Sequence, residues 1–154
     1  MNLMMAVERA TLVPTPEDDA IELWVTQALE TANRSLSPPP ELSIRITDTD
    51  EAAQFNETYR AKAGATNVLS FPASPPPETH SGLLGDLVIC APLVIEEAQT
   101  QDKQATAHWA HLVMHGVLHL LGYDHQTAAE AEAMELLEIS ALARLGYANP
   151  YDIQ

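Results

Sequence analysis

The sequence predicts an α+β fold in which a small mixed β-sheet packs against several helices. Short apolar or alternating segments, typical of strands, lie within the first 90 residues, whereas the remainder shows mainly helical periodicity. The chain has 154 residues, of which 46% are hydrophobic, so it can bury a substantial core without disulfides or metals. We therefore expect a single domain over residues 1–154.

The N-terminal part predicts strands and helices in turn. Residues 17–34 combine an acidic start with an apolar stripe and predict a helix. Residues 41–47 alternate polar and apolar side chains, as in a half-buried strand, and Asp48–Asp50 are expected to cap a helix that runs to about Tyr59. A further strand is expected over residues 5–13, and the prolines of 37–40 predict an extended connector.

The second half begins with strands and ends with helices. Residues 66–71 predict a short strand closed by Pro72, and residues 84–90 predict a central strand because they are almost continuously apolar. An exposed loop is expected between them, over about 74–81. Helical periodicity then predicts helices over the ranges 92–101, 104–121 and 127–145, with Gly146 ending the last.

The charge of the chain restricts its partners. A net charge of −15 opposes general electrostatic attraction to nucleic acid or to an anionic membrane. Any phosphate must therefore be met by local positive charge, for which Arg45, Arg60, Lys62 and a bound divalent cation are the candidates. Much of the acidity falls on residues expected to form a solvated helix face, namely Glu130, Glu132, Glu135 and Glu138.

Cysteine content and hydropathy favour a soluble cytoplasmic protein. Cys90 is the only cysteine, which excludes an intramolecular disulfide, and its apolar surroundings predict a small buried side chain. The N-terminus lacks the pattern of a signal peptide. The longest apolar run, 87–95, is shorter than the ~20 residues needed to span a bilayer, so no membrane association is expected.

The histidines give the strongest functional indication. Five of the six lie between residues 108 and 125, and three of them share the segment His115-Gly-Val-Leu-His119-Leu-Leu-Gly122-Tyr-Asp-His125. Side chains four residues apart share one face of a helix, and Gly122 can end that helix and turn the chain back. His115, His119 and His125 are therefore expected to bind one metal ion.

Three imidazoles and one open coordination position are typical of a catalytic zinc ion. The spacing also occurs in metzincin proteases, where a glutamate follows the first histidine, but here that residue is Gly116. The pattern thus indicates a metal-dependent hydrolase that lacks the proton acceptor of a peptidase. Nickel or another metal stays open, since imidazole suits several ions.

The segment 115–125 resembles the H-G-x-L-H-L-x-G-Y-D-H signature of the YbeY family of bacterial endoribonucleases. Further blocks resemble the same family in the same order, from about residue 41 to the C-terminus: Tyr59-Arg60, Thr66–Pro72, Leu84–Cys90 and Ala107–His111.

The resemblance implies a zincin-like fold, one Zn²⁺ on His115, His119 and His125, and cleavage of single-stranded RNA. It also implies a role in maturing the 3′ end of 16S rRNA and in late ribosome quality control. The partners implied are small-subunit ribosomal proteins and an Era-type GTPase. Arg60 matches the family's functional arginine, and Ser70, with Thr66 and Asn67, is expected at a substrate-contacting edge of the cleft.

These residues suggest a mechanism as a hypothesis. The ion held by His115 and its partners would activate water and polarise the phosphate, while Arg60 would bind the scissile phosphate. The attacking group, a water or the RNA 2′-hydroxyl, stays open. Asp124 is expected either to orient a ligand histidine from outside the coordination sphere or only to shape the turn.

Other polar residues are expected to have structural roles. Asp86 is expected at the entry of a strand, and His108 and His111 are expected to pack beside Trp109 rather than to line the cleft. Two other functions stay open: a ribosome assembly factor with a structural zinc ion, which the acidic charge favours, and a zinc peptidase.

Overall fold

A mixed four-stranded sheet forms the centre of the computed structural model, which describes residues 3–34, 38–73 and 81–151. The strand order is β1-β2-β4-β3. β1 (Met4–Ala10) and β2 (Glu41–Thr47) are parallel, as are β2 and β4 (Leu83–Cys90), whereas β3 (Val68–Pro72) is antiparallel to β4. The predicted α+β class and the interior position of β4 are thereby confirmed.

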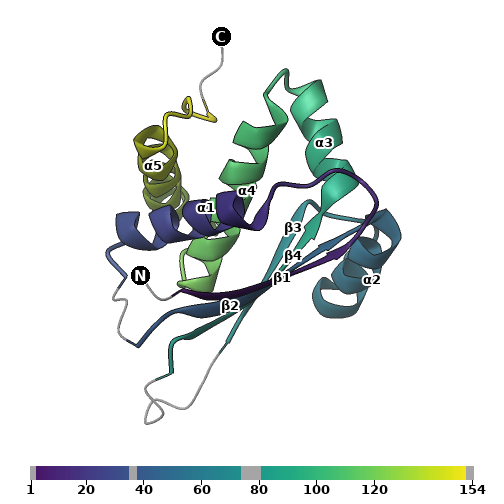
Figure 1. Cartoon of the computed structure of the whole chain (residues 1–154), viewed down its shortest axis with the longest axis horizontal. Coiled ribbons are helices and arrows are strands. Elements are labelled where there is room, and N and C mark those ends of the chain that lie inside the picture. Colours follow the sequence, from purple (N-terminus) through teal and green to yellow (C-terminus); the bar gives the residue numbers. More distant parts are fainter. Residues whose placement is uncertain (1–2, 35–37, 74–80, 152–154) are drawn as a thin grey trace.

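The described residues form five helices, most of which cover one face of the sheet (Figure 1). They are α1 (Asp18–Thr31), α2 (Thr49–Arg60), α3 (Ala91–Thr100), α4 (Ala105–Leu120) and α5 (Ala128–Arg144). Of these, α2 lies on the other face of the sheet (Figure 1). No helix in the described part of the chain is long and apolar enough to cross a membrane.

The alternation in β2 explains how the core forms. Leu42, Ile44 and Ile46 are buried and join a core cluster with residues of α1 and α4. Ser43 and Arg45 point to the opposite face of the sheet, because successive side chains of a strand alternate. α4 packs on β3 and β4 and also contacts α1, α3 and α5, so it is the central helix of the fold.

Several expected boundaries differ from the structure. α1 ends at Thr31, before residue 34, because Asn33 has a left-handed backbone with φ 57°. Asp48 does occupy the N-cap of α2, but its carboxylate accepts a hydrogen bond from Thr11 rather than from the helix backbone. β1 covers Met4–Ala10, so the expected strand over 5–13 ends too late.

The strand expected over residues 66–71 is shifted to Val68–Pro72. Pro72 is its last residue rather than its stop, which is tolerated because β3 is an edge strand. Most of the loop expected over 74–81, and residue 37 of the expected connector, lie outside the described residues.

Candidate metal centre and cleft

The end of α4 brings three histidines together. His115 and His119 lie one helical turn apart, and their Nε2 atoms are 3.1 Å from each other. Gly122, with φ 101°, then ends the helix, while the Tyr123 amide donates to the carbonyl of Leu118 over 3.1 Å. The chain turns back and places a ring nitrogen of each of His115, His119 and His125 within 4.8 Å of the others.

These nitrogens fit a divalent transition metal. Two imidazole nitrogens bound to tetrahedral zinc at ~2.0–2.1 Å lie roughly 3.3 Å apart, close to the His115–His119 separation. Burial lowers the pKa of His119, as do the neighbouring charges of His115 and His125, and this favours the neutral ring that a metal requires. Because all three donor atoms are imidazole nitrogens, the site suits zinc and also other borderline ions.

A cleft of about 740 Å³ opens in front of the three histidines. One side consists of α4 and the turn after it, and the other of β3 with the end of α2. Thr66, Asn67 and Ser70 line the β3 side. The Ser70 hydroxyl donates to the carbonyl of Gly116 over 3.3 Å, which joins β3 to the histidine-bearing helix.

Arg60 lines the same cleft from the last position of α2. Among the described residues it forms no ion pair, so its guanidinium is available to a ligand. Arg45 differs, because it pairs with Glu8 and with Glu51, the latter at 2.7 Å. Lys62 is exposed and is not among the residues that line the cleft.

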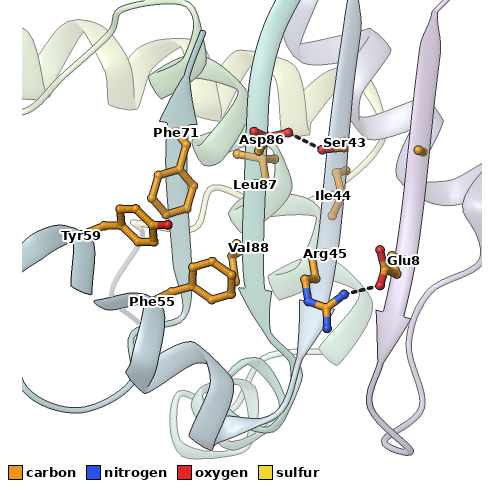
Figure 2. Close-up of a pocket in the computed structure, with 11 residues that line it drawn as sticks. Glu8, Ser43, Ile44, Arg45, Phe55, Tyr59, Phe71, Asp86, Leu87 and Val88 are labelled. Carbon is orange, nitrogen blue, oxygen red and sulfur yellow. Dashed lines mark hydrogen bonds and ion pairs between the residues drawn. The ribbon is translucent and has the colours of Figure 1, made fainter. Parts of the chain in front are cut away.

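A second hollow of about 480 Å³ lies on the open face of the sheet, beside α2 (Figure 2). Phe55, Tyr59 and Phe71 form an aromatic cluster there, with the rings of Tyr59 and Phe71 5.2 Å apart. Tyr59 and Phe71 also line the histidine cleft, so the two hollows are neighbours. Asp86 belongs to the open face, where it accepts a hydrogen bond from Ser43, and does not line the histidine cleft.

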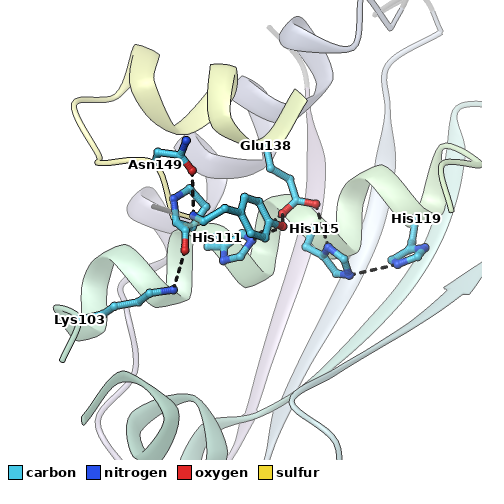
Figure 3. A network of polar contacts seen from close by, with 8 residues as sticks. Lys103, His111, His115, His119, Glu138 and Asn149 are labelled. Carbon is cyan, nitrogen blue, oxygen red and sulfur yellow. Dashed lines mark hydrogen bonds and ion pairs between the residues drawn. The ribbon is translucent and has the colours of Figure 1, made fainter. Parts of the chain in front are cut away.

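Glu138 contradicts its expected place on a solvated helix face. It is fully buried, with 0% exposure, and reaches from α5 to the histidines of α4 (Figure 3). Its Oε2 accepts from Nδ1 of His115 over 2.9 Å, and its Oε1 accepts from Nε2 of His111 over 2.5 Å. The hydroxyl of Tyr151 donates to the same Oε1 over 2.6 Å.

This network controls the protonation of Glu138. Burial raises the pKa of the Glu138 carboxyl, but hydrogen bonds from His111 and His115 outweigh burial and lower the pKa to about 2. Burial and the adjacent Glu138 raise the pKa of Tyr151, which therefore stays a hydrogen-bond donor. Glu138 is accordingly an ionised acceptor.

The sequence does carry a signal for Glu138. The buried residues of α5 include Met134, Ala141 and Leu142, and Glu138 falls on the same stripe at helical spacing. An acidic residue on an apolar stripe indicates a buried partner. Because Glu130, Glu132 and Glu135 precede it, Glu138 was predicted to belong to the same solvated acidic face.

Asp124 and the earlier histidines have defined contacts. Oδ1 of Asp124 accepts from the backbone N–H of His125 over 2.8 Å, a contact that shapes the turn. His108 is buried and pairs with Glu97 at 2.9 Å, whereas His111 contacts Glu138 and Tyr151. Neither His108 nor His111 lines the histidine cleft.

Gly116 occupies the position at which a metzincin carries its glutamate. It is buried against the sheet, and a Cβ atom there would lie 2.9 Å from Leu87 and 3.3 Å from Val68. A side chain at this position would therefore start toward the sheet, and the ends of Leu87 and Val68 would have to move to admit it.

Comparison with known proteins connects this chain to one family. A family model described as endoribonuclease YbeY matches residues 8–146. A protein of that name from Methylococcus capsulatus is 51% identical over 147 residues, which cover 96% of this chain and 94% of the relative. One from Cellvibrio japonicus is 53% identical over 89% of this chain and 76% of its own length.

A solved structure supports the fold independently. The solution structure of a protein from Thermotoga maritima matches with a TM-score of 0.58 at 18% identity, covering 97% of this chain and 100% of that one.

Proposed function

The chain belongs to the YbeY family of endoribonucleases and is a hydrolase that acts on RNA; from this premise we propose a zinc-dependent enzyme that cleaves single-stranded RNA in the maturation of the 16S rRNA 3′ end. The observation that carries the proposal is the convergence of three histidine ring nitrogens on a cleft that Arg60 also lines.

His115, His119 and His125 would hold the ion through ring nitrogens, with His115 presenting Nε2 because its Nδ1 is occupied by Glu138. A bound zinc ion supplies Lewis-acid chemistry and lowers the pKa of water. The three rings supply no negative charge, so the cationic site attracts a phosphodiester.

Arg60 would bind the scissile phosphate. A guanidinium stays charged and its donors match two phosphate oxygens, so Arg60 opposes the charge that develops in the transition state. Ser70 would contact the substrate from the β3 wall of the cleft. Its hydroxyl donates to the carbonyl of Gly116 and keeps its lone pairs, with which it can accept a hydrogen bond from the substrate. Asp124 would support the site indirectly, by holding the turn that presents His125.

The cellular role that we propose is late quality control of the small ribosomal subunit, in the cytoplasm. The net charge of −15 repels free RNA but suits contact with basic ribosomal proteins. Small-subunit proteins and an Era-type GTPase are the proposed partners.

The experiment that tests this function compares substrates and one pair of variants. We expect zinc-loaded protein to cleave single-stranded RNA, and a chelator to abolish the cleavage, while unfolded protein incubated in parallel stays intact. Arg60→Ala should lower kcat/KM for RNA by about 10²–10³-fold, as expected for one transition-state donor.

Lys62→Ala is the matched control, because Lys62 is an exposed cation near Arg60 but outside the cleft lining. It should retain cleavage within a factor of two, and both variants should bind zinc as the parent does. Full activity of Arg60→Ala would refute the role of Arg60, and proteolysis without RNA cleavage would refute the proposed function.

A further inference from the structure

Glu138 is a buried charge whose location needs an explanation. An ionised carboxylate in a protein interior is costly unless its oxygens are hydrogen-bonded and its charge is compensated. Both oxygens of Glu138 are engaged, Oε2 by His115 and Oε1 by His111 and Tyr151. An apolar residue would suit this stripe of α5 at lower cost, so packing alone does not explain a carboxylate at this position.

The contact with His115 fixes the proton on that ring. An ionised carboxylate only accepts hydrogen bonds, so Nδ1 of His115 must carry the hydrogen in the 2.9 Å contact. A neutral imidazole has one N–H group, and Nε2 therefore keeps its lone pair. That Nε2 lies 3.1 Å from Nε2 of His119, on the side where the three rings converge.

The other oxygen of Glu138 is held by residues that do not belong to the proposed metal site. Tyr151 donates to Oε1 from the segment after α5. This segment is itself fixed, because Nζ of Lys103 donates to the carbonyl of Pro150 over 3.2 Å and the Tyr151 amide donates to the side chain of Asn149 over 2.8 Å (Figure 3). The carboxylate is thus oriented from a second direction.

We propose that Glu138 is the positioning residue of the metal centre: it holds His115 in the Nδ1–H tautomer and aims Nε2 at the ion, while Tyr151 orients Glu138. The inference rests on the proposed function, since it requires the three histidines to bind a metal. Carboxylates that orient ligand histidines in this way typically change metal affinity by about 10–100-fold.

A purely structural role is the alternative, because Glu138 also joins α5 to α4 through His111. Glu138→Gln separates the two roles. The amide has the shape of the carboxylate, but whichever way it turns, either His115 or the pair His111 and Tyr151 faces an N–H group instead of an oxygen. Glu132→Gln is the matched control, an exposed glutamate on the same helix.

The measurements are the Zn²⁺ dissociation constant of the full chain, by competition with a chromogenic chelator, and the ring ¹⁵N NMR signals of His115 in metal-free protein. For Glu138→Gln we expect zinc binding weakened about 10–100-fold and a mixture of His115 tautomers, because the amide oxygen is a weaker acceptor than the carboxylate even when it faces His115. Glu132→Gln should match the parent in both. Tyr151→Phe should weaken zinc binding less, and it tests the same idea if Glu138→Gln does not fold.

The outcomes are distinguishable. Parental zinc affinity and tautomer in both Glu138→Gln and Tyr151→Phe, with only a lower melting temperature, would overturn the positioning role and leave the proposed function intact. Failure of the parent protein to bind Zn²⁺ would overturn the proposed function and this inference with it.

Discussion

At the scale of single residues, the contacts of each ring nitrogen give the histidines of α4 different roles. The Nε2 atoms of His115 and His119 face each other at 3.1 Å, so both can bind one common ion. His108 instead directs Nε2 to Glu97, and its buried Nδ1 has no hydrogen-bond partner among the described residues. His108 is therefore a core histidine that is costly to protonate.

This difference predicts a pH dependence of stability. Burial lowers the pKa of His108, although Glu97 opposes the effect, while Lys103 and His111 add to it. Below a pH of about 6.5 the unfolded chain takes up a proton on this residue that the folded chain does not, so the free energy of unfolding falls with decreasing pH. Urea unfolding of chelator-treated protein at pH 7.5 and 5.5 measures this loss.

His108→Gln keeps a donor for Glu97 but does not titrate, so its stability should decrease less over the same pH range. An equal decrease in both proteins would show that His108 does not contribute. The comparison is made without metal because protons compete with a metal ion for the ligand histidines, which would add a second pH dependence.

Single residues also show the limit of sequence reasoning. The spacing of His115, His119 and His125 was sufficient to predict that they converge, because helix geometry and a turn-forming glycine determine it. Glu138 was misplaced because its partners depend on how α5 crosses α4: its helical spacing indicates burial but not which residues it contacts. Likewise, the pairing of Arg45 with Glu8 depends on the register of β1 with β2.

At the scale of elements, the cleft depends on how β3 pairs with β4. Gly85 lies opposite Pro72 with φ 136°, and a Cβ atom there would come within 2.2 Å of the Phe71 carbonyl oxygen. Only glycine permits this approach. β3 carries the cleft wall with Ser70, so the pairing positions part of the candidate site.

Gly85→Ala should therefore destabilise the protein by about 3 kcal/mol or more, since it combines backbone strain with a steric overlap. Gly64→Ala is the control, because Gly64 also has a positive φ but has no atom within 4 Å of the added Cβ. It should cost only about 1–2 kcal/mol of strain. Urea unfolding compares them, and equal losses would contradict the steric argument.

Element types followed from periodicity, whereas element ends were predicted well for β2, α4 and α5 but not for β1, β3 and α1. α4 and α5 were predicted to within about one residue, as both have long amphipathic patterns and a glycine shortly after the end. The bounds predicted for β3 were wrong because no local feature of residues 66–72 indicates where β4 offers hydrogen-bond partners. Pairing partners lie elsewhere in the chain, so their positions are not a local property.

At the scale of the whole molecule, the balance of charge predicts which form of the RNA substrate is cleaved faster. With 22 acidic and 7 basic residues, the protein repels a free polyanion, and Arg60 in the cleft provides only local attraction. We expect kcat/KM on precursor 30S particles to exceed that on naked RNA of the same sequence by about 10–10³-fold, because docking on basic proteins replaces electrostatic steering.

Cleavage rates measured on both substrates over a range of salt concentrations would test this, with Arg60→Ala as the inactive reference. Strong, salt-insensitive cleavage of naked RNA would contradict the proposal that the enzyme docks on the ribosomal particle.

The most direct measurement is the metal content of the purified chain beside that of His119→Ala, with His108→Gln as a histidine control on the same helix. We predict about one zinc ion per chain in the parent and in His108→Gln, and almost none in His119→Ala. Metal retained at the parental level in His119→Ala would contradict a site built by His115, His119 and His125.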